Sequence, residues 1–166
     1  MTYSLRKPTP ADATAVSALV QAVFAEFIAP DWEAHAQAVF AIESSAERFT
    51  ELLVDPAFAA VAEDGESLVG FILLPTPSLL AFFFVEGRLH KQGVGKALWQ
   101  AARSHIELAF PGTKTVELNS SPSGFAAYKA LGFYPISEPF RRGGCVATRM
   151  ACWLPGRSLA QASDAA

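Results

Sequence analysis

Two kinds of hydrophobic periodicity alternate along the chain and divide it into helices and strands. Segments whose apolar residues recur every three or four positions predict amphipathic helices at residues 10–28, 32–42 and 46–54 (two short helices or one broken helix), 94–110 and 122–131. Short runs rich in β-branched and aromatic residues, bounded by turn residues, predict strands at residues 3–6, 58–62, 68–74, 79–85, 115–118, 133–136 and 145–153. This order predicts an α+β domain with a mixed, mostly antiparallel central sheet of about six to seven strands flanked by about four helices.

Local signals support these boundaries. Residues 9–12, Thr-Pro-Ala-Asp, form a capping box with proline at the first helical position. No repeat or low-complexity linker interrupts the chain, so residues 1–154 are expected to form one domain, followed by a flexible C-terminal tail at residues 155–166. Cys145 and Cys152 are seven residues apart in one predicted strand, so they face opposite sides and are poorly placed to form a disulfide.

Charge and composition narrow the class of protein. The chain has 166 residues and a net charge of −3, and its longest apolar run, residues 79–85, is far too short to span a membrane. The polar first ten residues lack the hydrophobic core of a signal peptide, which favours a cytoplasmic protein. Residues 1–66 carry 11 acidic and three basic side chains, a balance of −8, and the remaining residues carry five acidic and ten basic ones, a balance of +5. Without a basic tract or a set of metal ligands, no nucleic acid and no metal are expected.

The stretch from Phe82 to Leu98 is the clearest candidate for a functional site. A buried strand ends near Val85, a basic glycine-containing loop follows, and an amphipathic helix starts at Val94. The first N–H groups of a helix lie at the positive end of its dipole and favour an anion. Because no acidic residue lies in residues 87–105, we expect this loop to bind a phosphate group.

Two familiar phosphate-binding loops do not match this stretch. A P-loop requires glycine at the position of His90 and serine or threonine at that of Ala97. The dinucleotide fingerprint requires a small residue at the position of Leu98. Gly93 and Gly95 alone also suit a purely structural turn.

The loop resembles the acetyl-CoA loop of the GNAT superfamily of N-acetyltransferases, whose pattern is Gln or Arg, two residues, Gly, one residue, and Gly or Ala. Here residues 90–95 read His-Lys-Gln-Gly-Val-Gly, with His90 in place of Gln or Arg. The order of predicted elements is also similar to the GNAT fold over nearly the whole chain. The resemblance implies that acetyl-CoA is the co-substrate, that the backbone edges of Phe83 and Val85 pair with its pantetheine amides beside a bulge in the strand, and that the cofactor contacts Phe83, Phe84, Val85, His90, Lys91, Gln92, Gly93, Val94, Gly95, Lys96, Asn119 and Ser121.

A second motif is similar to another GNAT signature. Residues 128–133, Tyr-Lys-Ala-Leu-Gly-Phe, match the pattern of tyrosine, three residues, glycine and phenylalanine. The resemblance implies that Tyr128 is the general acid, because a phenol with a pKa near 10 stays protonated at neutral pH and can give its proton to a departing thiolate. Tyr128 also suits a packing role beside Phe125 and Leu131.

No motif indicates the general base. Many GNAT members carry a carboxylate on the fourth strand, but here only Glu86 follows that strand. His90 suits a phosphate contact, a base or a surface residue, and the first role is favoured. His35, Glu26 and Glu33 lie in the helical region that borders the acceptor pocket of this family, so a base acting through water from there stays open.

The resemblance implies direct transfer of the acetyl group to a primary amine within a ternary complex. Phe24, Phe27, Trp32 and residues 140–142 lie in elements that border the acceptor pocket of this fold, and each also suits the core or the surface. A small-molecule amine is the expected acceptor, the acidic first part of the chain slightly favours a cationic one, and a peptide or protein N-terminus stays open. A non-catalytic acyl-CoA-binding sensor, an interaction domain that keeps the fold, and assembly into a homodimer stay open as well.

Overall fold

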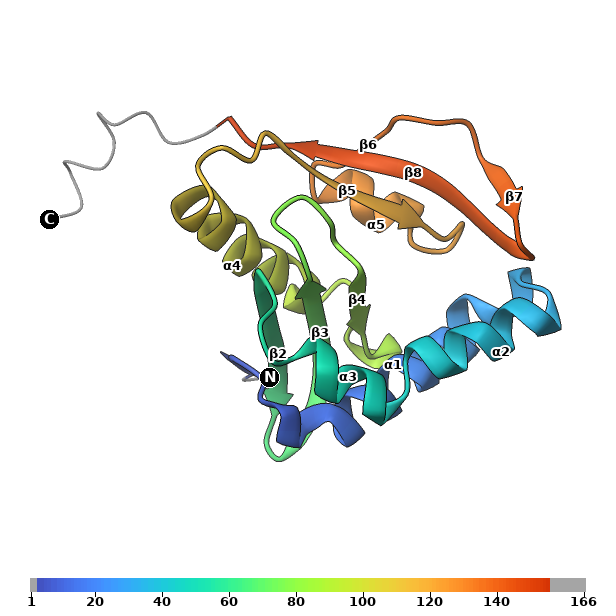
Figure 1. Cartoon of the computed structure of the whole chain (residues 1–166), viewed down its shortest axis with the longest axis horizontal. Helices are drawn as coiled ribbons and strands as arrows, with labels where there is room; N and C mark the ends of the chain where they lie inside the picture. Colours follow the sequence, from blue (N-terminus) through green and yellow to red (C-terminus); the bar gives the residue numbers. More distant parts are fainter. Residues whose placement is uncertain (1–2, 156–166) are drawn as a thin grey trace, which may run out of the picture.

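The computed structural model describes residues 3–155, which form two antiparallel sheets (Figure 1). The first sheet contains, in this order, β1 (Ser4–Arg6), β2 (Phe58–Asp64), β3 (Ser67–Leu74) and β4 (Phe82–Val85). The second sheet contains β5 (Thr115–Ser120), β8 (Cys145–Trp153) and β6 (Tyr134–Pro135), and β7 (Phe140–Arg142) also pairs with β8. The predicted C-terminal tail lies, from residue 156 onward, outside the described residues.

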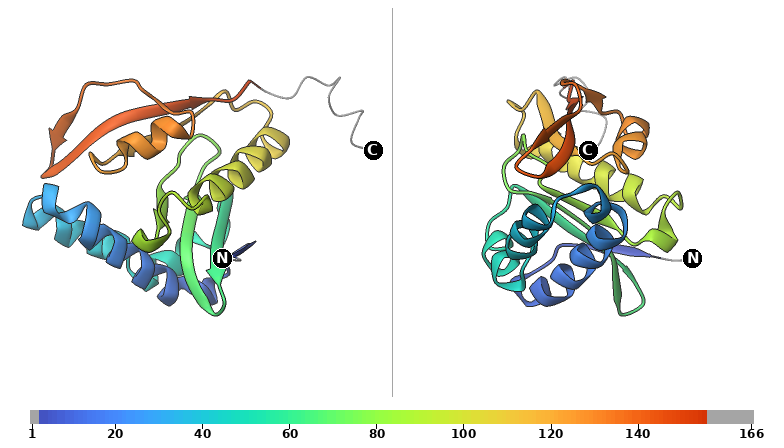
Figure 2. Two further views of the ribbon diagram at one scale, coloured as in Figure 1. Left: turned by 180° about the vertical axis from the view of Figure 1, so that it is seen from behind. Right: turned by 90° about the vertical axis from the view of Figure 1, so that its right-hand side faces the viewer.

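Helices cover both faces of the first sheet (Figures 1 and 2). One face packs against α1 (Ala13–Phe27) and α3 (Ala46–Leu52), with α2 (Ala34–Glu43) between these two helices in sequence. The other face packs against α4 (Val94–Ala109), and α5 (Phe125–Ala130) follows β5. The remaining turns are the 3-10 helices η1 (Pro10–Asp12), η2 (Ala29–Asp31) and η3 (Gly87–Leu89).

β4 separates two hydrophobic cores, because successive side chains of a strand point to opposite faces. Phe83 and Val85 pack into the core around α4, whereas Phe82 and Phe84 pack into the core around α1 and α3. The strand is therefore fixed on both faces, and only its outer backbone edge remains available.

The two sheets touch at one place and then diverge. Just before β4, the Leu80 N–H donates to the Glu117 carbonyl (3.0 Å), and the Glu117 N–H donates to the Ser78 carbonyl (2.8 Å). Beyond this parallel bridge β4 pairs only with β3, so its other edge faces the space between the sheets.

The predicted α+β organisation, with mostly antiparallel strands, is confirmed. Two details differ from the predicted boundaries. The strand predicted at residues 79–85 begins only at Phe82, because the preceding residues pair with Glu117 instead. The helix predicted from residue 122 begins at Phe125, because the Ser121 hydroxyl accepts the Gly124 N–H (3.2 Å) and holds a turn there.

Five α-helices are present within residues 3–155, against the predicted count of about four, because residues 32–54 form two separate helices. The strand β7 was not predicted, since its sequence Phe-Arg-Arg has no alternating pattern. Among the described residues, no helix combines the length and the hydrophobicity needed to cross a bilayer.

Candidate active site

The loop between β4 and α4 leaves a row of backbone N–H groups without partners. Lys91 and Gly93 have positive φ values of 63° and 88°, and they turn the chain into the start of α4. Within residues 3–155, no group accepts a hydrogen bond from the N–H of Gly93, Val94, Gly95 or Lys96. These donors and the dipole of a 16-residue helix form a site for an anion.

The side chains around this loop fall into two groups. Lys91 and Lys96 are exposed and form no ion pair with any described residue. Arg88 instead pairs with Glu86 (2.9 Å) and Asp64 (3.4 Å). The Gln92 side chain donates to the Arg88 carbonyl (2.7 Å), so this predicted contact residue stabilises the loop itself. The two lysines are therefore the charges left to face an anion.

The His90 ring lies on the backbone of β4. Its Nε2 atom is 2.8 Å from the Val85 carbonyl oxygen, and its ring centroid is 4.8 Å from that of Phe27. A Cβ atom at Gly87 would lie 2.8 Å from the Phe27 ring, so the loop packs directly on this phenylalanine. Phe27 thus supports the predicted cofactor loop and is not among the residues that line the cavity described below.

The outer edge of β4 presents the backbone groups of Phe83 and Val85. The Glu86 N–H donates to the Val69 carbonyl (2.9 Å), and opposed residues of antiparallel strands alternate between bonded and non-bonded pairs. The N–H and carbonyl groups of Phe83 and Val85 therefore point away from β3. Within the described part of the chain, the His90 ring is the only group seen to bond to this edge.

The strand is irregular at its start. The Ala81 N–H donates to the Leu73 carbonyl (3.0 Å), although the residue opposite Leu73 is Phe82. Ala81 and Phe82 therefore both oppose Leu73, as in a β-bulge. It lies where β4 leaves the bridge to Glu117, beside the cavity that opens between the sheets.

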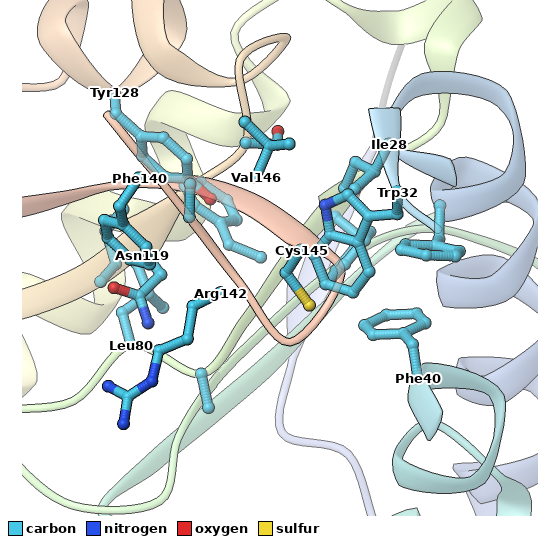
Figure 3. Close-up of a pocket in the computed structure, with 17 residues that line it drawn as sticks. Ile28, Trp32, Phe40, Leu80, Asn119, Tyr128, Phe140, Arg142, Cys145 and Val146 are labelled. Carbon is cyan, nitrogen blue, oxygen red and sulfur yellow. The ribbon is translucent and has the colours of Figure 1, made fainter. Parts of the chain in front are cut away.

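A cavity of about 370 Å³ lies between the two sheets and α1 (Figure 3). Its aromatic lining consists of Phe24, Trp32, Phe40, Phe83, Phe84, Tyr128 and Phe140. Its polar lining residues are Asn119, Ser121, Arg142 and Cys145, together with the Tyr128 hydroxyl. Of the three predicted substrate residues, the structure brings Phe24 and Trp32 to the cavity.

Tyr128 belongs to α5 and lines the cavity. Its ring centroid lies 6.0 Å from that of Phe83 and 5.7 Å from that of Phe133, and its hydroxyl forms no hydrogen bond to any described residue. Burial raises the pKa of Tyr128 above its ordinary value, because the charged phenolate is disfavoured away from water. The site therefore holds a protonated and unpaired phenol.

Asn119 and Ser121 differ in how free their side chains are. The Ser121 hydroxyl bonds to the Gly124 N–H (3.2 Å) and to the Ser123 hydroxyl (3.1 Å), so it stabilises the start of α5. The Asn119 amide forms no side-chain hydrogen bond within residues 3–155, and Figure 3 shows it on the same side of the cavity as Tyr128. Asn119 is thus the freer polar group on β5.

Aromatic side chains from α1, from α2 and from Trp32, the residue after η2, form one wall of the cavity. The rings of Phe24 and Phe40 are stacked with centroids 3.9 Å apart, and Trp32 meets Phe24 edge to face at 5.2 Å. The Trp32 Nε1 atom is buried and has no hydrogen-bond partner among the described residues. An unpaired buried donor is costly, which makes this N–H a candidate ligand contact.

One end of the cavity is closed by a contact between distant segments. The Glu33 N–H donates to the Gly144 carbonyl (3.0 Å), and the Glu33 carboxylate lies 3.8 Å from the Arg141 guanidinium. A Cβ atom at Gly144 would lie only 2.7 Å from the His35 ring, so the turn between β7 and β8 fits directly on the start of α2. Figure 1 shows these two segments meeting at the end of the long strand β8.

None of the predicted base candidates lines the cavity. His35 and Glu33 belong to the closing contact, Glu86 pairs with Arg88, and Glu26 lies beside Gly87. Cys145 does line the cavity, and burial raises the pKa of its thiol, which disfavours the nucleophilic thiolate.

Several cavity residues were not predicted as site residues, and Phe40 is the clearest case. Phe40 is one of several apolar residues in an amphipathic helix, a pattern that indicates only packing. Cys145 was predicted only as a strand residue, and nothing in its neighbourhood in the sequence distinguishes it. Arg142 lies in the segment predicted to border the pocket.

Comparisons with known proteins agree with this geometry. A family model described as an acetyltransferase (GNAT) domain matches residues 21–154. No curated protein sequence matches significantly. A solved structure described as a GCN5-related N-acetyltransferase, aminotransferase class II, from Rhodopseudomonas palustris has a TM-score of 0.77 and 20% identity, covering 93% of this chain and 97% of that chain.

Two further solved structures contain coenzyme A. The PaiA N-acetyltransferase from Thermoplasma acidophilum has a TM-score of 0.76 and 17% identity, covering 92% of this chain and 99% of that chain. An aminoglycoside 6'-N-acetyltransferase has a TM-score of 0.66 and 17% identity, covering 95% of this chain and 99% of that chain. Since the family model covers most of the chain, the protein belongs to the GNAT family and is an N-acetyltransferase with the GNAT fold.

Proposed function

We propose that this protein transfers the acetyl group of acetyl-CoA to a primary amine of a small molecule, by direct attack within a ternary complex. The observation that carries the proposal is the meeting of three features at one cavity. The free edge of β4 borders it, the unpaired N–H groups of α4 lie at the end of the same strand, and the unpaired hydroxyl of Tyr128 belongs to its lining.

Acetyl-CoA would follow the order of these features. Its pyrophosphate would accept hydrogen bonds from the N–H groups of residues 93–96, with Lys91 and Lys96 nearby. Its pantetheine arm would pair with the backbone edge of Phe83 and Val85. Asn119 supplies a polar contact from the facing strand. Coenzyme A in two structures of the same fold supports this use of the cofactor.

The chemistry needs one proton donor and no covalent enzyme intermediate. The amine nitrogen forms a bond to the acetyl carbon, the carbon–sulfur bond breaks, and the departing thiolate takes the proton of Tyr128. A free N–H at the start of β4 stabilises the developing oxyanion. The amine proton leaves to water, because no carboxylate or imidazole of the described residues lines the cavity, and water returns a proton to the Tyr128 phenolate to complete the cycle. The raised pKa of Tyr128 keeps the phenol protonated before transfer.

The closing contact supports a small acceptor over a peptide. The hydrogen bond from Glu33 to Gly144 and the ion pair from Glu33 to Arg141 join the two sides of the cavity. An extended chain would have to break this contact to pass between α2 and the β7–β8 turn. A cavity of about 370 Å³ holds a thioester and a small amine without such a change.

The test combines cofactor binding with thiol release. Isothermal titration with acetyl-CoA is expected to show one site, and a panel of small amines is expected to accelerate release of the CoA thiol above the rate without amine. An absence of acetyl-CoA binding would contradict the proposal and favour an interaction domain. Binding without thiol release for any amine would favour an acyl-CoA sensor.

A further inference from the structure

The charge of the acceptor cavity is unusual for a site that receives an amine. Within residues 3–155, no aspartate, glutamate, histidine or lysine lines it, and Arg142 is its only charged side chain. In Figure 3, Arg142 lies with Asn119 and Leu80 on one side, whereas Trp32 and Phe40 lie on the other. A cationic substrate finds no carboxylate in this cavity.

Arg142 differs from its neighbour Arg141 in how its charge is used. The Arg141 guanidinium lies 3.8 Å from the Glu33 carboxylate and belongs to the closing contact, outside the cavity lining. Arg142 is exposed and has no ion pair or hydrogen bond with the described residues. Its five donors are therefore free to bind a carboxylate in a bidentate manner.

The aromatic wall formed by Phe24, Trp32 and Phe40 holds no carboxylate and no polar acceptor. The rings of Phe24 and Phe40 are nearly parallel, with an interplanar angle of 17° at 3.9 Å, so each ring covers one face of the other. The free polar group of this wall is the Trp32 N–H, which is a donor and repels an ammonium group. The wall thus suits an apolar or aromatic body with hydrogen-bond acceptors.

Resting on the proposed acetyl transfer, we infer that the acceptor is an amine with an aromatic or apolar body and a carboxylate that pairs with Arg142, and that polycationic amines are poor substrates. Arg142 then selects the substrate by its carboxylate. This expectation differs from the slight preference for cations that the acidic residues 1–66 indicate, because those acidic side chains lie outside the cavity lining.

The test compares amines that differ in one group. Phenylalanine and phenethylamine differ by a carboxylate, and kanamycin presents several ammonium groups. Initial rates of CoA thiol release give kcat/KM for each. We expect phenylalanine to exceed phenethylamine by about tenfold or more and kanamycin to give no measurable rate, since a charge-assisted hydrogen-bonded pair contributes about a tenfold to hundredfold preference.

Variants of the two neighbouring arginines test whether Arg142 causes the preference for a carboxylate. Arg142→Gln is expected to lower kcat/KM for phenylalanine by about tenfold and to leave phenethylamine within about twofold. Arg142→Lys keeps the charge and most of the preference. Arg141→Gln serves as the matched control, because its side chain lies outside the cavity lining, and the ratio between the two amines is expected to stay unchanged.

The outcomes separate this inference from the proposed function. A wild-type preference for kanamycin or phenethylamine, or a carboxylate preference that survives in Arg142→Gln, would overturn the inference and leave acetyl transfer intact. Thiol release with none of the three amines would overturn the inference, whereas the proposed function is overturned only if no amine of the wider panel gives thiol release while acetyl-CoA still binds. The exposed and unpaired position of Arg142 leads us to expect unchanged thermal stability in both of its variants.

Discussion

The two ends of the proposed active site are built from different parts of the polypeptide. The proposed cofactor end consists of backbone groups, namely consecutive N–H groups at residues 93–96 and the free edge of β4. The proposed acceptor end consists of side chains from α1, α2, the residue after η2 and the β7–β8 hairpin, and the hairpin lies about a hundred residues or more further along the chain than the others. Backbone groups can bind the same ligand in proteins of very different sequence, whereas side-chain contacts require particular residue types for each ligand.

This difference has a physical consequence for substitutions. At the cofactor end a change matters when it alters backbone conformation or fills the space beside it. At the acceptor end a change matters when it removes one functional group, even if the backbone stays in place. Tyr128 lies between the two ends and is expected to follow neither rule, because in the proposed reaction it donates a proton to the departing thiolate.

The largest effect is expected for Tyr128→Phe. The variant keeps the ring contacts with Phe83 and Phe133 and removes only the unpaired hydroxyl, so the fold is not disturbed. We expect kcat to fall by about 10² to 10⁴, which is the usual contribution of a general acid, with acetyl-CoA affinity unchanged. Steady-state thiol release and isothermal titration measure the two quantities. A kcat within about threefold of the wild type would exclude the phenol as the acid.

The pH dependence of kcat gives an independent check on Tyr128. The group must be protonated to donate, so activity is lost as the pH rises through its pKa, and burial raises that pKa. We therefore expect kcat to show no alkaline decrease below about pH 10, the ordinary value for tyrosine. A decrease between neutral pH and about pH 9 that disappears in Tyr128→Phe would instead indicate a lowered pKa.

Gly95→Ala tests the backbone rule at the cofactor end. A Cβ atom there would lie 3.6 Å from the Phe83 ring and 3.8 Å from Val85, which is ordinary contact, and alanine is the better helix former by about 1 kcal/mol. We expect the variant to be at least as stable as the wild type. Its methyl group nevertheless fills the space beside the edge of β4, so we expect acetyl-CoA to bind about tenfold more weakly, or about 1.4 kcal/mol.

Gly112→Ala provides the matched control for this substitution. A Cβ atom at Gly112 would meet nothing within 4 Å, and the residue lies in the turn after α4, away from the loop. Thermal unfolding and titration with acetyl-CoA are measured for both variants. Unchanged affinity in Gly95→Ala would mean that the cofactor does not pass between α4 and β4.

Trp32→Phe tests the side-chain rule at the acceptor end. The indole N–H is buried without a described partner, so its removal takes away an unsatisfied donor and is expected to change stability little. If the N–H donates to the acceptor, kcat/KM for that amine falls about fivefold while acetyl-CoA affinity stays constant. The control is Trp99→Phe, which removes the other such N–H from the core beside Phe133 (4.7 Å). Equal effects of both variants on the acceptor would exclude a direct contact.

The loop geometry at the proposed cofactor end could be predicted from the sequence because the residues that form it are close together in the chain. Gly93 and Gly95 have the spacing of the loop, Val85 ends the strand, and the helix follows at once, so the residues that build the anion site are neighbours in the chain. The end of the helix that carries Tyr128 could also be predicted from the sequence, because Gly132 adopts a positive φ of 98° there, a conformation that favours glycine.

The acceptor end could be predicted only in part because its residues meet through tertiary structure. Phe24 and Trp32 were identified from the elements they belong to, but Phe27 lies one turn away, against the cofactor loop. Phe40 is indistinguishable in the sequence from a core residue. The contact between Glu33 and Gly144 depends on a hairpin that no sequence pattern indicated.

The smallest effect is expected for His90→Ala, which tests whether a side chain contributes to binding at the proposed cofactor end. The resemblance predicts that His90 contacts phosphate, yet its ring lies 2.8 Å from the Val85 carbonyl, a group that the pantetheine arm would need. Because the backbone N–H groups and the two exposed lysines remain to bind the anion, we expect release of this carbonyl to strengthen acetyl-CoA binding by about threefold, or about 0.6 kcal/mol. Isothermal titration decides between the roles: tighter binding means that His90 competes for the edge of β4, and weaker binding means that it contacts the phosphates. His90→Gln, which restores a residue of the GNAT pattern, is the matched control, since an amide side chain can serve the phosphates.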